Sequence, residues 1–253
     1  MKIARKLLLI LSVIIGVLLL LNVVTYFNYH HEAYLFKMFN FDKEKNLPSI
    51  FSALILLMAS ATLLYVSFQA LSFQVSNVFW RSLSIIFLFL SFDELLRIHE
   101  KVGAFTASHI KGDGAFHYEW LIPYSVILLF LIFTYAKSIF ALPKQVRYNM
   151  IISGVLFVGG AVGFEMIGGM YIENNGLLTV EAIKNSKATF LLYTIEETLE
   201  MLGVVYFIYT LVLCIETYKI RGLVKQEIPF FTTFRVTVDK IPTLLRKFRS
   251  CEK

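Results

Sequence analysis

Six apolar stretches, each about 20 residues long, most constrain what this chain can fold into. A hydrocarbon core about 30 Å thick is crossed by about 20 residues of helix rising 1.5 Å each. In lipid, every backbone polar group must be bonded within its own segment, so such stretches form helices. We therefore predict an all-α, polytopic integral membrane protein, a single bundle of six transmembrane helices at about 7–27, 49–71, 79–99, 120–142, 148–171 and 190–216.

Composition agrees with lipid as the main solvent. Hydrophobic residues make up 57% of the chain and charged residues only 17%, which is too apolar for an ordinary soluble domain. The net charge of +6 could suggest nucleic acid as a partner. However, the Lys and Arg residues lie between the apolar stretches and in the last segment, where cytoplasmic loops carry them. We interpret the basicity as topology and expect membrane lipid, not nucleic acid, as the partner.

The charge distribution predicts the orientation. With the N-terminus inside, 16 of the 24 Lys and Arg residues fall on the cytoplasmic side, and 14 of the 18 Asp and Glu residues fall in the outer half. We therefore expect both termini in the cytoplasm and the bundle in the plasma (inner) membrane. Residues 1–216 would form the bundle. Residues 217–253 would form a basic cytoplasmic tail, whose mixture of apolar residues and cations is typical of a segment lying on anionic lipid.

Ionisable residues gather near the outer end of the third span. At about 100° per residue, Asp93, Arg97 and Glu100 share one stripe of a helix, with Glu94 at its flank. His99 lies well around such a helix. It belongs to this cluster only if the helix ends or bends nearby.

The fifth and sixth spans bring further acids to the same depth. Glu165 lies in a glycine-rich stretch, 159–169, whose small residues predict a helix-packing face, so the glutamate should point into protein. In the sixth span, Tyr193, Glu196 and Glu200 share one stripe, with Glu197 beside it. Counted from the outer ends, these acids and Asp93 lie roughly 8 to 15 Å inside the membrane at 1.5 Å per residue.

The acids of this cluster outnumber its fixed cations, Arg97 and Lys101. A charge at membrane depth costs about 3 kcal/mol even on insertion scales, so the excess must be relieved by bound metal, shared protons or water. An oxygen-rich ligand set suits Ca²⁺, Mg²⁺ or Mn²⁺, and Zn²⁺ if His99 or His117 joins it. The metal ligands would be Asp93, Glu165, Glu196, Glu200 and His99. The alternative is structural, with ion pairs in the third span and acids stabilised by the helix dipole at the start of the sixth.

Three functions fit these patterns. The first is a membrane-embedded hydrolase or transferase acting on a lipid-type substrate, the second a proton- or cation-coupled transporter, and the third an ion-sensing or assembly protein without catalysis. The cytoplasmic halves of the spans carry almost no ionisable residues, which favours a blind-ended site over conduction. In the enzyme, Asp93, Glu165, Glu196 and Glu200 would be acid/base groups or ligands. Binding residues would be Glu94, Arg97, Glu100, Glu197 and Tyr193.

Overall fold

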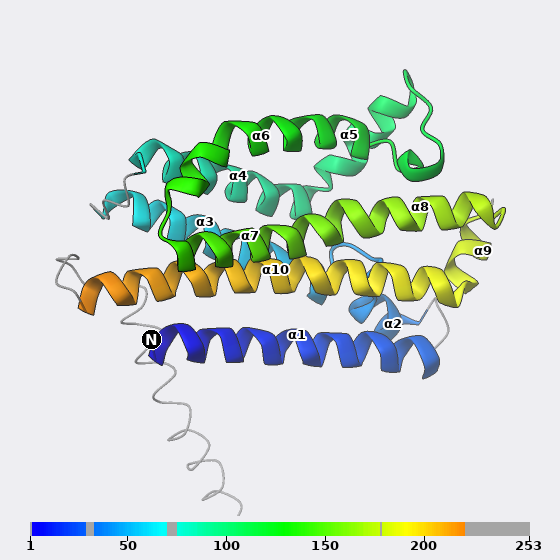
Figure 1. The fold of residues 1–253 in the computed structure, drawn as a ribbon. Coiled ribbons are helices and arrows are strands. Elements are labelled where there is room, and N and C mark those ends of the chain that lie inside the picture. The colour runs from blue at the N-terminus through cyan, green and yellow to red at the C-terminus, as the bar shows by residue number, and fades with distance from the viewer. Residues whose placement is uncertain (1, 29–32, 70–74, 178, 221–253) are drawn as a thin grey trace, which may run out of the picture.

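The fold was obtained as a computed structural model, which describes residues 2–28, 33–69, 75–177 and 179–220. Residues 218–220 are described by their backbone alone. Every regular element within these residues is a helix, as predicted (Figure 1). Five helical segments are long and apolar enough to cross a membrane. They are α1 (Lys2–Asn28), α3 (Leu47–Phe68), α6 (Leu121–Ala141), the continuous stretch Lys144–Asn174, and Lys187–Thr217 within α10 (Lys187–Ile220).

The sixth predicted span corresponds to α4 (Asn77–Leu96), which packs against α3. Arg81 lies near one end of α4 and Asp93 and Glu94 lie near the other, so every stretch of 18 residues in α4 contains all three charges. Each of the other five segments contains an apolar stretch of that length with at most two charged residues. The finding is therefore a helical, multi-pass membrane protein with five candidate spans, and α4 is a long helix of the same bundle.

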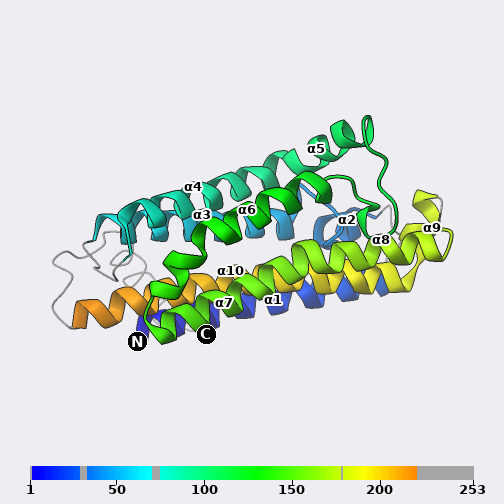
Figure 2. The ribbon, with the colours of Figure 1, turned by 45° about the horizontal axis from the view of Figure 1, so that its top comes forward.

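The long helices run side by side and form two layers (Figures 1 and 2). One layer holds α3, α4 and α6, and the other holds α1, α10 and the stretch made of α7 (Lys144–Val158), η2 (Gly159–Phe164) and α8 (Glu165–Asn174). Helix α10 lies at the centre and contacts α1, α3, α7, η2 and α8. Its residues Met201, Ile208 and Leu211 are at most 1% exposed and join Leu63 of α3 in the core. The structure therefore places α10 where it can carry buried functional groups.

The two ends of the bundle differ. At one end lie the short helices α2 (Tyr34–Phe39), α5 (Ile98–Ala107) and α9 (Val180–Asn185) (Figure 1). At the other end the start of α1 meets the end of α10, because Glu216 accepts hydrogen bonds from the backbone N–H groups of Ile3 (2.9 Å) and Ala4 (3.4 Å). A carboxylate is stabilised at a helix N-terminus by the helix dipole. The two ends of the described chain therefore lie together.

Helix α6 faces outward along almost its whole length. Within α6, all of which is described, only Leu121 is buried, whereas Phe130 and Phe133 are 66% and 79% exposed. A continuous apolar surface of this kind is unfavourable in water and is expected against lipid.

Helix α3 begins at a capped residue, and the predicted tail follows the end of α10. Asn46 caps α3 by accepting the N–H of Ser49, whose side chain accepts the N–H of Asn46 in return, and Pro48 occupies the first turn, where its missing N–H costs nothing. The predicted basic tail lies outside the described residues from position 221 onward.

Candidate functional site

The helical path breaks at Arg97, and this break brings His99 into the acidic cluster. Helix α4 ends at Leu96, Arg97 adopts a left-handed conformation (φ 56°), and α5 begins at Ile98. The backbone N–H of His99 donates to Asp93 Oδ1 at 2.7 Å, and His99 Nδ1 lies 3.4 Å from Asp93 Oδ2. The helix therefore does end near His99, which is the condition under which His99 belongs to the acidic cluster.

Asp93 is the most buried member of the cluster, with 7% of its surface exposed. Besides the two groups of His99, it accepts a hydrogen bond at 3.1 Å from the hydroxyl of Tyr124, near the start of α6. A buried carboxylate needs such donors to stay ionised. The contacts fix Asp93 as an acceptor that orients the His99 ring.

Glu44, in the segment between α2 and α3, completes this half of the site. Its Oε1 lies 3.4 Å from His99 Nε2, and its other oxygen pairs with the guanidinium of Arg97, which also pairs with Glu100. The sequence analysis missed Glu44 because a loop residue has no periodicity that relates it to a helix. The described chain has two non-glycine residues with positive φ, Lys45 (59°) and Arg97, and both adjoin this ion pair. Strained backbone of this kind concentrates at functional sites.

The charges around His99 favour its protonated form. Burial alone would lower the pKa of the imidazole, but the hydrogen bond and charge of Asp93, together with the charge of Glu44, raise the pKa above its ordinary value. Burial raises the pKa of the Glu44 carboxyl, and the neighbouring cations His99 and Arg97 oppose this effect. His99 and Glu44, whose pKa values are both raised, therefore face each other at 3.4 Å.

The second half of the site lies on α8 and α10. Glu165 begins α8 directly after the π-helical turn η2, and its Oε1 accepts a hydrogen bond at 3.2 Å from the indole N–H of Trp120. The side chains of Glu165 and Glu196 lie next to each other, close enough for a hydrogen bond if one carboxyl carries a proton. The Trp120 ring also lies 5.4 Å from the His99 ring, centroid to centroid. Trp120 thus lies between the two halves.

Close packing of η2 on α10 sets the position of the remaining carboxyls. A Cβ on Gly160 would lie 2.7 Å from the backbone oxygen of Glu196 and 2.9 Å from Cγ of Glu200. The predicted packing role is confirmed at Gly160, but not at Gly159 or Gly163, where nothing lies within 4 Å of the added atom. Glu94, Glu197 and Glu200 are half-buried electrostatic neighbours of one another.

The predicted metal centre finds no support in this geometry. Within the residues that the structure describes, no group of three or more Asp, Glu, His or Cys side chains is placed to hold a metal ion. Asp93 bonds to His99 and to Tyr124, while Trp120 contacts the His99 ring on one side and Glu165 on the other. The sequence had placed all these groups at one depth, but equal depth does not bring side chains to a common point. His117 pairs instead with Glu173 at 3.1 Å, outside the cluster.

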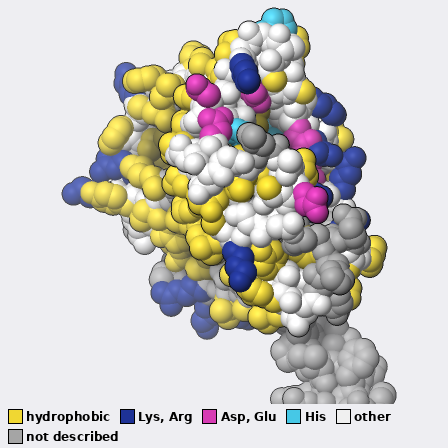
Figure 3. All heavy atoms as spheres, turned by 90° about the vertical axis from the view of Figure 1, so that its right-hand side faces the viewer, with side chains coloured by type: hydrophobic (Ala, Val, Ile, Leu, Met, Phe, Trp, Pro, Cys, Tyr) yellow, Lys and Arg dark blue, Asp and Glu magenta, His cyan; other side chains and the backbone are white. Residues whose placement is uncertain are grey.

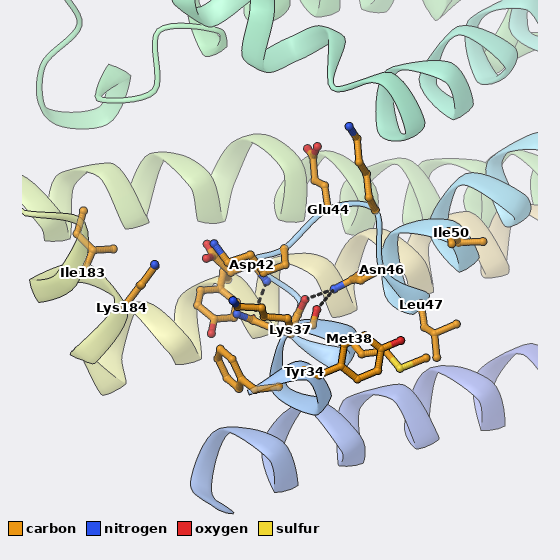
Figure 4. Close-up of a pocket in the computed structure, with 15 residues that line it drawn as sticks. Tyr34, Lys37, Met38, Asp42, Glu44, Asn46, Leu47, Ile50, Ile183 and Lys184 are labelled. Atoms are coloured by element: carbon orange, nitrogen blue, oxygen red, sulfur yellow. Dashed lines mark hydrogen bonds between the residues drawn. The ribbon is translucent and has the colours of Figure 1, made fainter. Parts of the chain in front are cut away.

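A pocket adjoins the site at this end of the bundle. It has a volume of about 690 Å³ and lies between α2, residues 40–47, Ile50 of α3 and residues of α9 and α10, including Tyr193, a predicted binding residue (Figure 4). Glu44 lines the pocket and also contacts His99, so the two regions share a wall. Viewed onto this end, the molecule shows acidic side chains beside histidine, together with lysine or arginine and apolar groups (Figure 3).

Comparison with known proteins places the chain in a family. Residues 7–215 match the model of a family described as Domain of unknown function (DUF8692), so the chain belongs to that family. No curated protein and no solved structure shows a significant match to it.

Proposed function

We propose that this member of the DUF8692 family is a membrane-embedded hydrolase or transferase that acts on a lipid-type substrate by acid–base chemistry. Six helices would cross the plasma membrane, with α4 as the third span and both termini in the cytoplasm. The site would then lie in the extracytoplasmic half of the bundle. The observation that supports this function best is the Asp93–His99–Glu44 series, which ends at the wall of a pocket.

In this proposal His99 is the general base. Asp93 contacts Nδ1 and so leaves Nε2 toward Glu44 and the pocket, an arrangement that orients an imidazole and stabilises its protonated form. The neutral form of His99 would take a proton from water, or from a hydroxyl acceptor, as that oxygen attacks an ester or phosphoester of the substrate, and Asp93 and Glu44 would stabilise the imidazolium that results. Arg97 would neutralise negative charge at Glu44 or on the substrate.

The Glu165–Glu196 pair would supply the proton for the leaving group. In this proposal the two adjacent carboxyls share one proton, which the pair donates and later regains. The general base and the proton donor would lie on opposite sides of Trp120, which contacts both. The proton taken by His99 would return to this pair through solvent, so the cycle leaves the protein unchanged.

A second function, a proton- or cation-coupled transporter, is favoured by the series of neighbouring carboxyls along α10. Against it, three hydroxyl side chains of α3, in the half of the bundle away from the acidic cluster, already donate hydrogen bonds to backbone carbonyls. Ser60 donates to the carbonyl of Ser84 at 2.8 Å, Thr62 to that of Met58 at 2.7 Å, and Ser67 to that of Leu64 at 2.6 Å. Such residues offer a passing ion few free ligands, which supports a blind-ended site.

The test is turnover by the reconstituted chain, assayed with a panel of ester and phosphoester lipids. We expect His99→Gln and Glu196→Gln each to lower the rate by about 10²-fold or more, as loss of a general acid or base does. His109→Gln is the matched control, because His109 is exposed and bonds to Phe105 and Ser108 outside the cluster. No turnover by the wild type, together with proton or cation flux into proteoliposomes that requires Glu196, would replace the enzyme with the transporter.

A further inference from the structure

The pocket beside the site has the size and the rigidity of a ligand site. Its volume of about 690 Å³ lies within the range of roughly 300 to 1,000 Å³ that small-molecule sites occupy. Its floor is anchored by Asn22, which is fully buried, accepts the N–H of Phe41 at 3.2 Å, and donates to Thr194 of α10 at 3.0 Å. Asn46 donates to the carbonyl of Asn40 at 2.7 Å and to that of Lys37 at 3.2 Å. The segment that forms the wall is therefore already held in place without a ligand.

The charges of the lining favour an anion. Four lysines line the pocket against two acids, Asp42 and Glu44, and Glu44 is already engaged by Arg97 and His99. Lys184 reaches from α9 toward Asp42 across the pocket (Figure 4). A compact ammonium group is a suitable partner for a phosphate or carboxylate. The four lysines are Lys37, Lys43, Lys45 and Lys184.

The apolar part of the lining continues onto the outside of the bundle. Leu47 and Ile50 line the pocket, and they are 39% and 44% exposed. Leu54 and Leu57 follow on the same helix at intervals of three and four residues and are 57% and 45% exposed, so an apolar stripe runs from the pocket along α3. A soluble anion would use the lysines and leave this stripe unused, whereas a lipid would use both.

We propose that the pocket between α2, α9 and the start of α3 binds the anionic head group of a membrane lipid, whose acyl chain lies along Leu47, Ile50 and Leu54. Glu44 belongs to both the pocket and the series that contains His99. An anionic lipid bound here is therefore the substrate class of the reaction, and this last step rests on the proposed function. Binding itself does not depend on that reaction.

The experiment is native mass spectrometry of the full chain in detergent, titrated with phosphatidylglycerol, with phosphatidylcholine of the same acyl chains, and with inorganic phosphate. The wild type is expected to bind phosphatidylglycerol at least tenfold more tightly than phosphatidylcholine. The double variant Lys43→Gln/Lys184→Gln is expected to lose at least fivefold of that affinity. Lys144→Gln, an exposed lysine at the start of α7, should stay within twofold of the wild type.

Three results overturn the proposal, and the first two do not depend on the variants folding. The first is equal affinity of the wild type for the two lipids, and the second is full displacement of phosphatidylglycerol by inorganic phosphate, which would make the ligand a soluble anion. Unchanged affinity in a folded double variant also overturns it. Selective lipid binding without turnover would contradict the proposed enzyme function and support the proposed lipid pocket. Turnover without selective binding would support the enzyme function and contradict the lipid pocket.

Discussion

Asp93 and His99 face each other across a break in the helical path, with the His99 backbone N–H 2.7 Å from Oδ1 and the His99 Nδ1 3.4 Å from Oδ2 of the same carboxylate. An uninterrupted helix would have pointed the two side chains in different directions, because residues six apart in the sequence lie about 120° apart around the helix axis. The left-handed conformation of Arg97 removes that difference. This Asp–His unit therefore forms from a single local segment, and Glu44 and Tyr124 complete it from elsewhere in the chain.

Stability should fall as the pH rises through the pKa of His99. The folded state holds the His99 proton more tightly than the unfolded chain does, since the pKa is raised from its usual value of about 6.5. The stabilising contribution is therefore fully present below about pH 6.5 and is lost as the pH rises through the higher, folded-state pKa. The measurement is the thermal unfolding midpoint of the purified chain in detergent between pH 5 and 9.

The variant His99→Gln should remove the upper part of that pH dependence. Glu44 also has a raised pKa, so its contribution has the same sign, but it begins to be lost at lower pH because an ordinary Glu titrates near 4.3. An unchanged profile in His99→Gln would assign the dependence to other groups. His109→Gln should retain the wild-type profile.

The left-handed backbone at Arg97 predicts an unusual order of stabilities. Arg97→Gly and Arg97→Ala both lose the ion pairs with Glu44 and Glu100, so their difference isolates the backbone. A side chain in this conformation costs about 1–2 kcal/mol and glycine avoids the cost, although glycine loses more entropy on folding. We expect Arg97→Gly to be more stable than Arg97→Ala by about 0.5–1 kcal/mol in chemical unfolding. A more stable alanine variant would mean that residue 97 continues the helix.

The long helices depend on local sequence, whereas the contacts of the site depend on tertiary packing. The long helices could be placed to within a few residues, because hydrophobic length and helix-breaking residues act locally. The approach of Glu44 to His99 could not, since it depends on how a loop packs across the ends of α4 and α5. Trp120 and Tyr124 lie near the start of α6, where the interface aromatics of membrane proteins also lie, but their polar atoms bond to Glu165 and Asp93. Interface aromatics and site aromatics have the same residue types and the same positions near helix ends.

The contact between η2 and α10 predicts different outcomes at two glycines of one turn. A Cβ at Gly160 meets the backbone oxygen of Glu196 at 2.7 Å, and backbone cannot move aside as a side chain can, so Gly160→Ala should destabilise by about 1–3 kcal/mol. It should also lower turnover by displacing Glu196 and Glu200. Gly163→Ala has open space around the added atom and should match or slightly exceed wild-type stability. Unfolding of both variants in the same detergent provides the comparison, and equal effects would contradict the close approach.

Asn22 should link the stability of the bundle to the shape of the pocket. Its side chain is the acceptor for Phe41 N–H and the donor to Thr194, all in the interior, so Asn22→Ala leaves a buried N–H without its acceptor and should cost about 1–3 kcal/mol. Asn28→Ala is the control, because Asn28 is exposed, donates to the carbonyl of Val24 in its own helix, and should change stability by less than about 0.5 kcal/mol. Because Phe41 adjoins Asp42 in the pocket wall, Asn22→Ala should also weaken lipid binding at temperatures where the chain is still folded. A stable Asn22→Ala chain with wild-type lipid affinity would show that the wall keeps its position without this anchor.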